Sequence, residues 1–342
     1  MYRLVFIGAL ICLMGCRPEV EVYAPERDTH IVWCVLDAQK DSQYVKITRT
    51  YQSQTDPLAN TDAEDYSLAN LTVVLEGNDK TYVAEMEEIQ RDSGLFVQNH
   101  TLYRFDTEGA DRLQGGKRYS LRITKPDDPD LLITAWTDIP TTPDLIQPSE
   151  PQYNPDRGSY TLPMIDLDDD FAVRAKNNSG EGYECRIFAD YEQNGEMKTV
   201  RWGPLPIARE PRGCEANVDR GYMCINIPGQ AVGNTFYRDI DLGLGPIQHY
   251  DSMRSANSLP ELSDVARVEF TAVDYHLTRF MYANNSFGYG LNLLMDKREL
   301  SNVEGADAGI FGSINHATRP VILDGCTKFK AGFIPAPPSN CE

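Results

Sequence analysis

Short runs in which apolar and polar residues alternate recur along most of the chain, and they constrain its fold more than any other feature. Successive side chains of a β-strand point to opposite faces, so each run can place one face in a core and the other in solvent. Gly, Asp, Asn and Pro residues typical of turns separate the runs. We therefore predict a mainly all-β fold that begins with an antiparallel β-sandwich. In the first half of the chain the predicted strands are 31–36, 44–49, 71–76, 81–84, 102–105, 118–123 and 131–136.

The second half continues with strands and contains one clear hairpin. Asn194-Gly195 lies between two alternating runs, and this dipeptide is the strongest short-range signal for a β-hairpin. We therefore predict a second β-rich domain. Its predicted strands are 183–191, 197–202, 222–227, 235–242 and 266–273.

One short helix is expected at 274–284. Asp274 precedes it and can accept hydrogen bonds from the free N–H groups of the first turn. Leu277, Phe280 and Met281 have the spacing i, i+3 and i+4, so they share one face of a helix. The pattern predicts an amphipathic helix that begins at an Asp274 cap.

A proline-rich segment suggests the domain boundary. A chain of 342 residues corresponds to about two domains. The segment 139–143, Ile-Pro-Thr-Thr-Pro, is stiff and lacks two backbone donors, as linkers often do. The predicted division is a signal peptide (1–15), a tether (16–29), a β-sandwich domain (30–138), a linker (139–160), a second β-rich domain with one short helix (161–323) and a Cys-bracketed tail (324–342).

The N-terminus has the pattern of an export signal. Arg3 is followed by an apolar run, 4–15, which is too short to span about 30 Å of hydrocarbon comfortably. The run ends in Leu13-Met14-Gly15-Cys16, which resembles the bacterial lipobox, in which the cysteine is lipidated and becomes the new N-terminus. Two or three acyl chains, such as palmitate, would anchor Cys16 stably in a membrane. The alternative is an ordinary secretory signal in which Cys16 is incidental.

The remaining cysteines favour disulfide bonds. Two of the eight cysteines lie in the signal or at its end, which leaves an even set of six in an exported protein. Zinc is the competing interpretation, but no Cys-x-x-Cys or Cys-x-x-His spacing occurs, so no metal is predicted here. Short loops favour two local pairs, and the two cysteines outside these pairs then form the third. The candidates are Cys214 with Cys224, Cys326 with Cys341, and Cys34 with Cys185.

The charge balance limits the partners. The formal net charge is −19, whereas binding to phosphate backbones requires a basic surface, so nucleic acid is excluded as a partner. Anionic lipid also repels an acidic body. We therefore expect the lipid anchor, rather than charge, to hold the protein at a membrane.

Candidate chemistry is sparse. Asp166, Asp168 and Asp170 match positions of a calcium-binding loop, but Phe171 and Asn177 stand where an EF-hand requires Gly and Glu. A looser calcium site and a solvated acidic turn both remain open. The sequence contains no Gly-x-Ser-x-Gly elbow, no Gly-rich phosphate loop ending in Lys and no His-x-x-x-His spacing. We therefore predict no catalytic residues and no cofactor.

The order of these features resembles an uncharacterised family of Bacteroidota outer-membrane lipoproteins found beside TonB-dependent receptors. The most specific segments are 301–305, Ser-Asn-Val-Glu-Gly, and 309–312, Gly-Ile-Phe-Gly. Segment 115–123, Gly-Gly-Lys-x-Tyr-x-Leu-x-Ile, resembles the return strand of the family's sandwich. The resemblance implies an immunoglobulin-like or transthyretin-like sandwich, the periplasmic or cell-surface face of the outer membrane, and a TonB-dependent receptor as partner. It implies no reaction.

The segment Gly309-Ile310-Phe311-Gly312 allows two interpretations. Glycine takes positive φ at low cost, so we expect a tight loop. Turned inward, Ile310 and Phe311 would close the end of a sheet; turned outward, they would form an apolar tip for a partner. They are the candidate partner contacts.

Two functions from different classes remain. The favoured one is a lipid-anchored, non-enzymatic cell-envelope protein that assists a TonB-dependent transporter by binding its substrate or the receptor. The strand pattern, the lipobox and the missing catalytic motifs favour it. The alternative is a secreted hydrolase that acts on glycan or peptide through an unrecognised carboxylate site.

Overall fold

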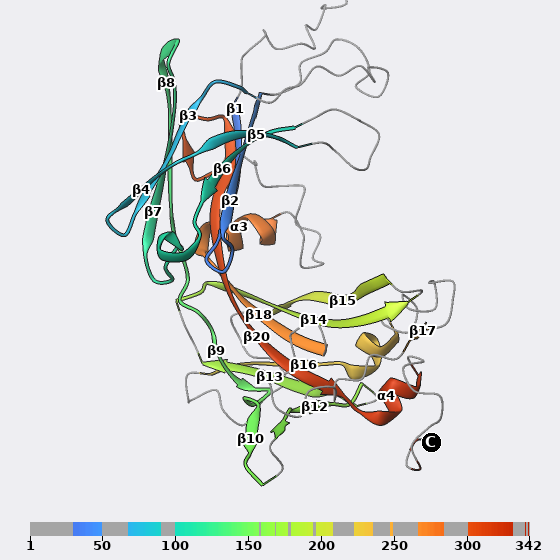
Figure 1. The fold of residues 1–342 in the computed structure, drawn as a ribbon. Coiled ribbons are helices and arrows are strands. Elements are labelled where there is room, and N and C mark those ends of the chain that lie inside the picture. The colour runs from blue at the N-terminus through green and yellow to red at the C-terminus, as the bar shows by residue number, and fades with distance from the viewer. Residues whose placement is uncertain are drawn as a thin grey trace, which may run out of the picture.

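One long strand, β20 (Ala308–Leu323), runs through both halves of the computed structural model and joins them (Figure 1). Its first part pairs in parallel with β1 (His30–Asp37), and its second part pairs antiparallel with β18 (Ala266–Val273). The two pairings meet at Ile314. The structure describes residues 30–49, 68–89, 100–156, 159–167, 169–176, 179–193, 196–207, 222–234, 247–248, 266–283, 300–330, 339 and 341.

The upper body in Figure 1 is a β-sandwich that contains the N-terminal strands. Its further elements are β2 (Ser42–Arg49), β3 (Thr72–Gly77), β4 (Lys80–Val83), β5 (Glu85–Ile89), β6 (His100–Asp106), the 3-10 helix η1 (Gly109–Asp111), β7 (Arg118–Lys125), β8 (Asp128–Asp138) and β19 (Val303–Glu304). One sheet has the order β20-β1-β2-β6-β5, and the other has the order β19-β8-β7-β3-β4. Two strands from the C-terminal end of the chain, β19 and β20, therefore complete the N-terminal sandwich.

The alternating pattern of the sequence forms the core of this sandwich. In β1, Val32, Cys34 and Leu36 are buried between the sheets, while Trp33 and Val35 are partly exposed on the other face. A fully buried side chain of this size contributes about 1.5–3 kcal/mol relative to an exposed one. The predicted fold class, mainly all-β, is confirmed.

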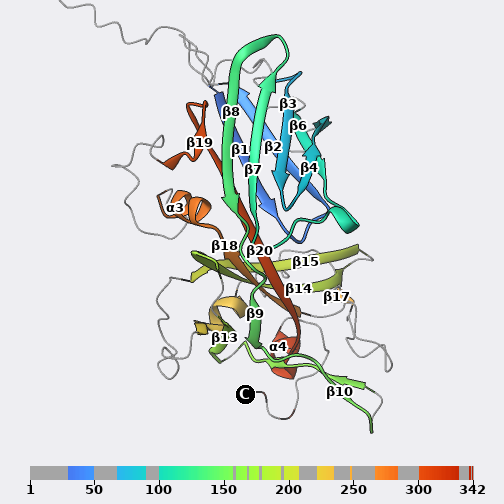
Figure 2. The same cartoon turned by 90° about the vertical axis from the view of Figure 1, so that its left-hand side faces the viewer.

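The lower body contains the remaining part of β20 and two packed layers of strands (Figure 2). Its further elements are β9 (Asp144–Gln147), β10 (Gln152–Asn154), β11 (Ser159–Thr161), β12 (Met164–Ile165), β13 (Phe171–Lys176), β14 (Gly182–Gln193), β15 (Glu196–Ile207), β16 (Tyr222–Ile227), a helical turn at 229–234, β17 (Ile247–Gln248) and α4 (Gly325–Lys330). The order β15-β14-β18-β20 forms one layer, and β16-β13-β9 forms the other. The predicted hairpin is present, because β14 and β15 pair from Gln193 and Glu196 onward.

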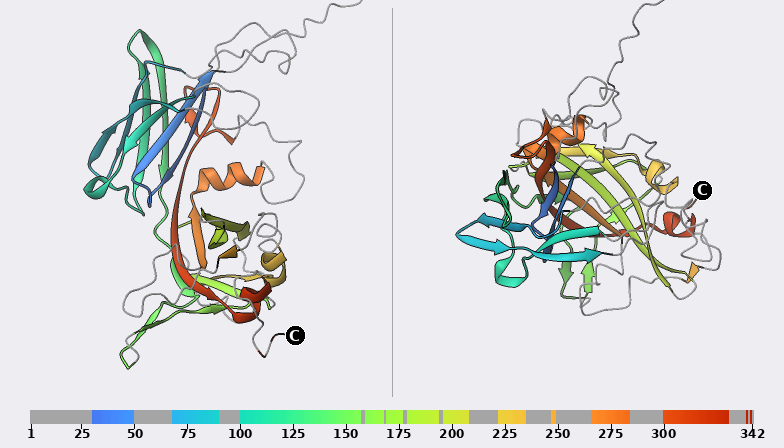
Figure 3. Two further views of the ribbon diagram at one scale, coloured as in Figure 1. Left: turned by 45° about the vertical axis from the view of Figure 1, so that its right-hand side comes forward. Right: turned by 90° about the horizontal axis from the view of Figure 1, so that it is seen from above.

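The predicted helix is α3 (Tyr275–Ala283), which lies beside β20 near the junction of the two bodies (Figure 3). Leu277 forms a small apolar cluster with Ile310 and Val273, and Phe280 and Met281 pack against it. The predicted apolar face is therefore confirmed. None of the helices in the described part of the chain is long and apolar enough to span a membrane.

The proline-rich segment is tied to the body of the protein. The side chain of Asn315 donates to Pro140 O at 2.9 Å, and Ile139 N donates to Lys117 O at 3.0 Å. Strands β9, β10 and β11 lie within the predicted linker 139–160. Since β20 also runs through both bodies, the proline-rich segment is not their sole connection.

The cysteines follow the prediction only in part. Cys326 and Cys341 form a disulfide, as predicted. Cys224 is also disulfide-bonded, but Cys214 lies outside the described residues, so that pairing stays a prediction. The pairing of Cys34 with Cys185 is wrong, because both are free thiols buried in different cores, one in each body. Burial raises the pKa of both thiols.

Candidate functional site

The segment 300–305 is held against the sandwich by the side chain of Asn302. Its amide oxygen accepts from Phe311 N at 2.9 Å, and its amide nitrogen donates to Phe311 O at 2.7 Å and to Trp136 O at 3.1 Å. Asn302 thus pairs with β20 as a backbone strand would. This contact links the two segments on which the family resemblance rests.

Close backbone approaches explain three glycines of these segments. Gly305 has φ +79°, and a Cβ there would lie 2.1 Å from Leu132 O. A Cβ on Gly309 would lie 2.4 Å from Val32 O, and one on Gly312 would lie 2.6 Å from Leu277 Cβ. Any larger residue at these positions would displace β8, β1 or α3.

The expected loop at 309–312 is wrong, because these residues are part of β20. Phe311 is fully buried in the core of the sandwich, and Ile310 is buried beneath α3. The two side chains point to opposite faces of the strand, as its pleat requires. They are therefore packing residues and not a surface contact for a partner.

Asp274 connects the start of α3 to the sandwich. Its carboxylate accepts hydrogen bonds from His276 N and Leu277 N, both at 3.1 Å, so it caps the helix as predicted. It also accepts from Ser313 N at 3.1 Å and from Thr137 Oγ1 at 2.9 Å. Burial raises the pKa of Asp274, and these hydrogen bonds oppose the shift.

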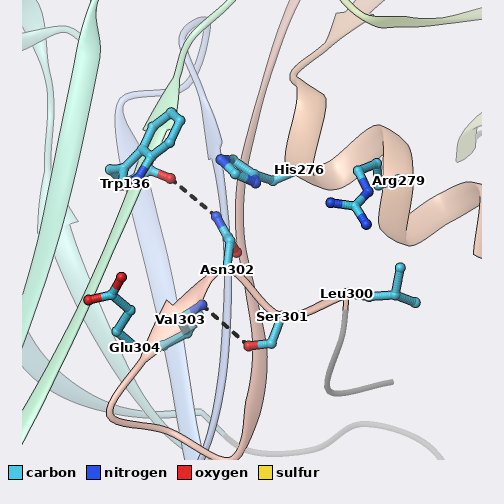
Figure 4. A pocket seen from close by; sticks show the side chains of 8 residues that line it. All are labelled: Trp136, His276, Arg279, Leu300, Ser301, Asn302, Val303 and Glu304. Carbon is cyan, nitrogen blue, oxygen red and sulfur yellow. Dashed lines mark hydrogen bonds between the residues drawn. The ribbon is translucent and has the colours of Figure 1, made fainter. Parts of the chain in front are cut away.

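A pocket of about 250 Å³ lies where β8, α3 and the segment 300–304 meet (Figure 4). The structural ties of Asn302 and Asp274 fix two of its walls, the segment 300–304 and the helix. The residues that line the pocket are Trp136, His276, Arg279, Leu300, Ser301, Asn302, Val303 and Glu304.

A stack of cationic and aromatic groups borders the pocket. The Arg118 guanidinium lies 4.1 Å from the centre of the Trp136 ring and forms two hydrogen bonds of 2.8 Å to Asp138. This guanidinium lowers the pKa of Asp138. Trp136 in turn meets the His276 ring edge to face at 4.7 Å. Trp136 remains 43% exposed, so part of its indole is available to a ligand.

Two basic side chains of α3 face the pocket. Figure 4 shows the His276 imidazole directed toward Trp136 and the Arg279 guanidinium extending toward Leu300 and Ser301. The buried Nε2 of His276 has no hydrogen-bond partner. Burial lowers the pKa of His276, and Arg279 adds to the shift, whereas Asp274 opposes it. The imidazole is therefore neutral near pH 7.

The other predicted site residues do not assemble into a site. Asp166 is partly buried and Asp170 is exposed, while Asp168 lies outside the described residues, so the calcium prediction stays untested as a set. Within the described ranges, no group of three or more His, Cys, Asp or Glu residues could hold a metal ion. Cys16 also lies outside the described residues.

Comparison with known proteins adds no relative. No protein-family model matches the sequence, and no curated protein matches it. Sequence reasoning singled out 301–305 but not Trp136, His276 or Arg279. The capping residue Asp274 predicted where the helix begins, but only the tertiary structure shows that this helix lies beside β8.

Proposed function

We propose that this protein is a lipid-anchored, non-enzymatic binding protein of the outer membrane that assists a TonB-dependent transporter. Cys16 provides the anchor, and the pocket between Trp136, α3 and 300–304 binds the transporter's substrate. The lipobox and the resemblance of segments 301–305 and 309–312 support this assignment.

The observation that carries the proposal is a contrast between two sets of polar groups. Three buried titratable groups serve the fold: Asp274 caps α3, Glu184 pairs with Arg186 at 2.8 Å, and Tyr103 donates to Leu68 O at 2.7 Å. Arg279 and His276 instead line the pocket, and neither the Arg279 guanidinium nor the buried Nε2 of His276 has a hydrogen-bond partner among the described residues. A concave site with few convergent polar groups is typical of binding.

Affinity purification tests the proposal. The tagged, lipidated protein is isolated from detergent-solubilised outer membranes, and the receptor identified by mass spectrometry is then tagged in turn. We expect a TonB-dependent receptor to be enriched in both directions over a Cys16→Ala control. Absence of enrichment in both directions would contradict the proposal.

A further inference from the structure

The pocket contains hydrogen-bond donors that lack acceptors among the described residues. The Arg279 guanidinium lies 5.5 Å from the Tyr275 ring and forms no ion pair within the part of the chain that the structure describes. The Nε2 atom of His276 also has no partner, but it is buried and therefore lies out of a ligand's reach. The Ser301 hydroxyl accepts from Val303 N at 3.3 Å, which leaves its proton free to be donated.

Two carboxylates that act on His276 are already used, and the carboxylate of Glu304, which also lines the pocket, is directed away from Arg279 (Figure 4). Arg118 holds both oxygens of Asp138, and four hydrogen bonds occupy the carboxylate of Asp274. The side of the pocket formed by Arg279 and Ser301 therefore presents unpaired donors and a positive charge without an ion-pair partner among the described residues, although the chain as a whole has a net charge of −19. A carboxylate would supply the acceptors that these donors lack.

We propose that the pocket binds a small organic acid, with its carboxylate held by Arg279 and Ser301 and its ring or apolar part against Trp136 and Leu300. A guanidinium presents two parallel N–H groups that match the two oxygens of a carboxylate. The inference rests on the proposed function, because it names the ligand class of the same pocket.

The size and rigidity of the pocket fit such a ligand. Its volume of about 250 Å³ is below the range of about 300–1,000 Å³ that holds drug-sized molecules. Asn302 fixes the segment 300–304 through three hydrogen bonds, and Asp274 fixes the start of α3. A preformed site loses less conformational entropy on binding.

Calorimetric titration of the full lipidated protein in detergent tests the charge requirement. The probes are two matched pairs of acid and neutral amide: glucuronate with glucuronamide, and phenylacetate with phenylacetamide. We expect the acid of at least one pair to bind about tenfold or more tightly than its amide. The pair that binds distinguishes a sugar acid from an aromatic acid as the source of the carboxylate.

Variants at one pocket residue and one distant residue test the location. Arg279→Gln should weaken binding of the acid by about tenfold or more, and Arg279→Lys should restore part of the affinity. Arg122→Gln is the matched control, because Arg122 is exposed and lies within 4.0 Å of Glu76 on the outer face of the sandwich. Its affinity should equal that of the wild type.

Three results would overturn the inference: equal binding of acid and amide, unchanged affinity in Arg279→Gln, or no binding of either acid up to about 10 mM. Each is independent of receptor enrichment in the affinity purification. A receptor that is still enriched would leave the proposed function standing while the ligand class fails.

Discussion

The hydroxyl of Thr137 donates a hydrogen bond of 2.9 Å to the carboxylate of Asp274, although the two residues are 137 positions apart in the sequence. The same carboxylate caps α3 and accepts from Ser313 N of β20. The cap of the helix and the contact between helix and sandwich are therefore one interaction. Any change at Asp274 should affect both.

Removal of this carboxylate should destabilise the protein strongly. Asp274→Ala loses the helix cap and leaves the N–H groups of Leu277 and Ser313 without an acceptor, so we expect the free energy of unfolding to fall by about 3 kcal/mol. Urea unfolding followed by circular dichroism measures the change. Asp170→Ala, at an exposed acidic position, should change it by less than about 0.5 kcal/mol. Equal effects of the two substitutions would refute the role of Asp274.

The pH dependence of stability should reflect the burial of Glu184. Burial is the largest effect and raises its pKa above the ordinary 4.5, while Arg186 opposes the shift. A carboxyl group with a raised pKa in the folded chain holds its proton more tightly there than in the unfolded chain. Its contribution to stability is therefore present below pH 4.5 and is lost as pH rises through the folded pKa.

The variant Glu184→Gln makes this effect measurable. As pH falls from about 7 toward 4.5, the free energy of unfolding of the wild type should increase relative to that of Glu184→Gln. Urea titrations at several pH values give the difference. A change of the opposite sign would mean that the ion pair with Arg186, 2.8 Å away, outweighs burial.

Truncation of Phe311 should create a cavity in the sandwich core. Phe311 is fully buried, so Phe311→Ala should lower the free energy of unfolding by about 3–5 kcal/mol. Val83→Ala is the control, because Val83 is 65% exposed in β4 of the same sandwich. A melting temperature of Phe311→Ala that matches the control would place Phe311 outside the core.

The disulfide between Cys326 and Cys341 should stabilise the C-terminal tail. It closes a loop with a sequence separation of 15, for which restriction of the unfolded chain contributes about 3 kcal/mol. Replacing both cysteines by serine should therefore lower the free energy of unfolding by about 3 kcal/mol. The difference from the wild type should vanish in the presence of a reductant; if it persists, the loss has another origin.

Local patterns predicted the elements well because they depend on neighbouring residues. The alternation in 31–36 and the Asn194-Gly195 dipeptide predicted β1 and the β14–β15 hairpin, and Asp274 predicted the start of α3. The pairing of β1 with β20 is different, because its partners lie more than 270 positions apart. No local pattern shows that Gly309 must approach Val32 or that β20 belongs to both bodies.

The candidate site could not be predicted for the same reason. Trp136 appears in the sequence as an ordinary strand residue and His276 as one of five scattered histidines. Only the crossing of α3 over β20 brings their rings to 4.7 Å. Likewise, the sequence alone allows Cys34 to pair with Cys185, whereas the fold buries these two residues in separate cores.

The membrane anchor is the most direct test of the account, because the compartment, the partner and the access of the pocket to a transporter's substrate all depend on Cys16. The measurement is the distribution of the protein between salt-washed membranes and the soluble fraction for the wild type, Cys16→Ala and the control Cys12→Ala. The account predicts that Cys16→Ala moves the protein to the soluble fraction, whereas Cys12→Ala leaves it in the membrane. If Cys16→Ala stays in the washed membranes to the same extent as the wild type, the lipid anchor and the function proposed from it are contradicted.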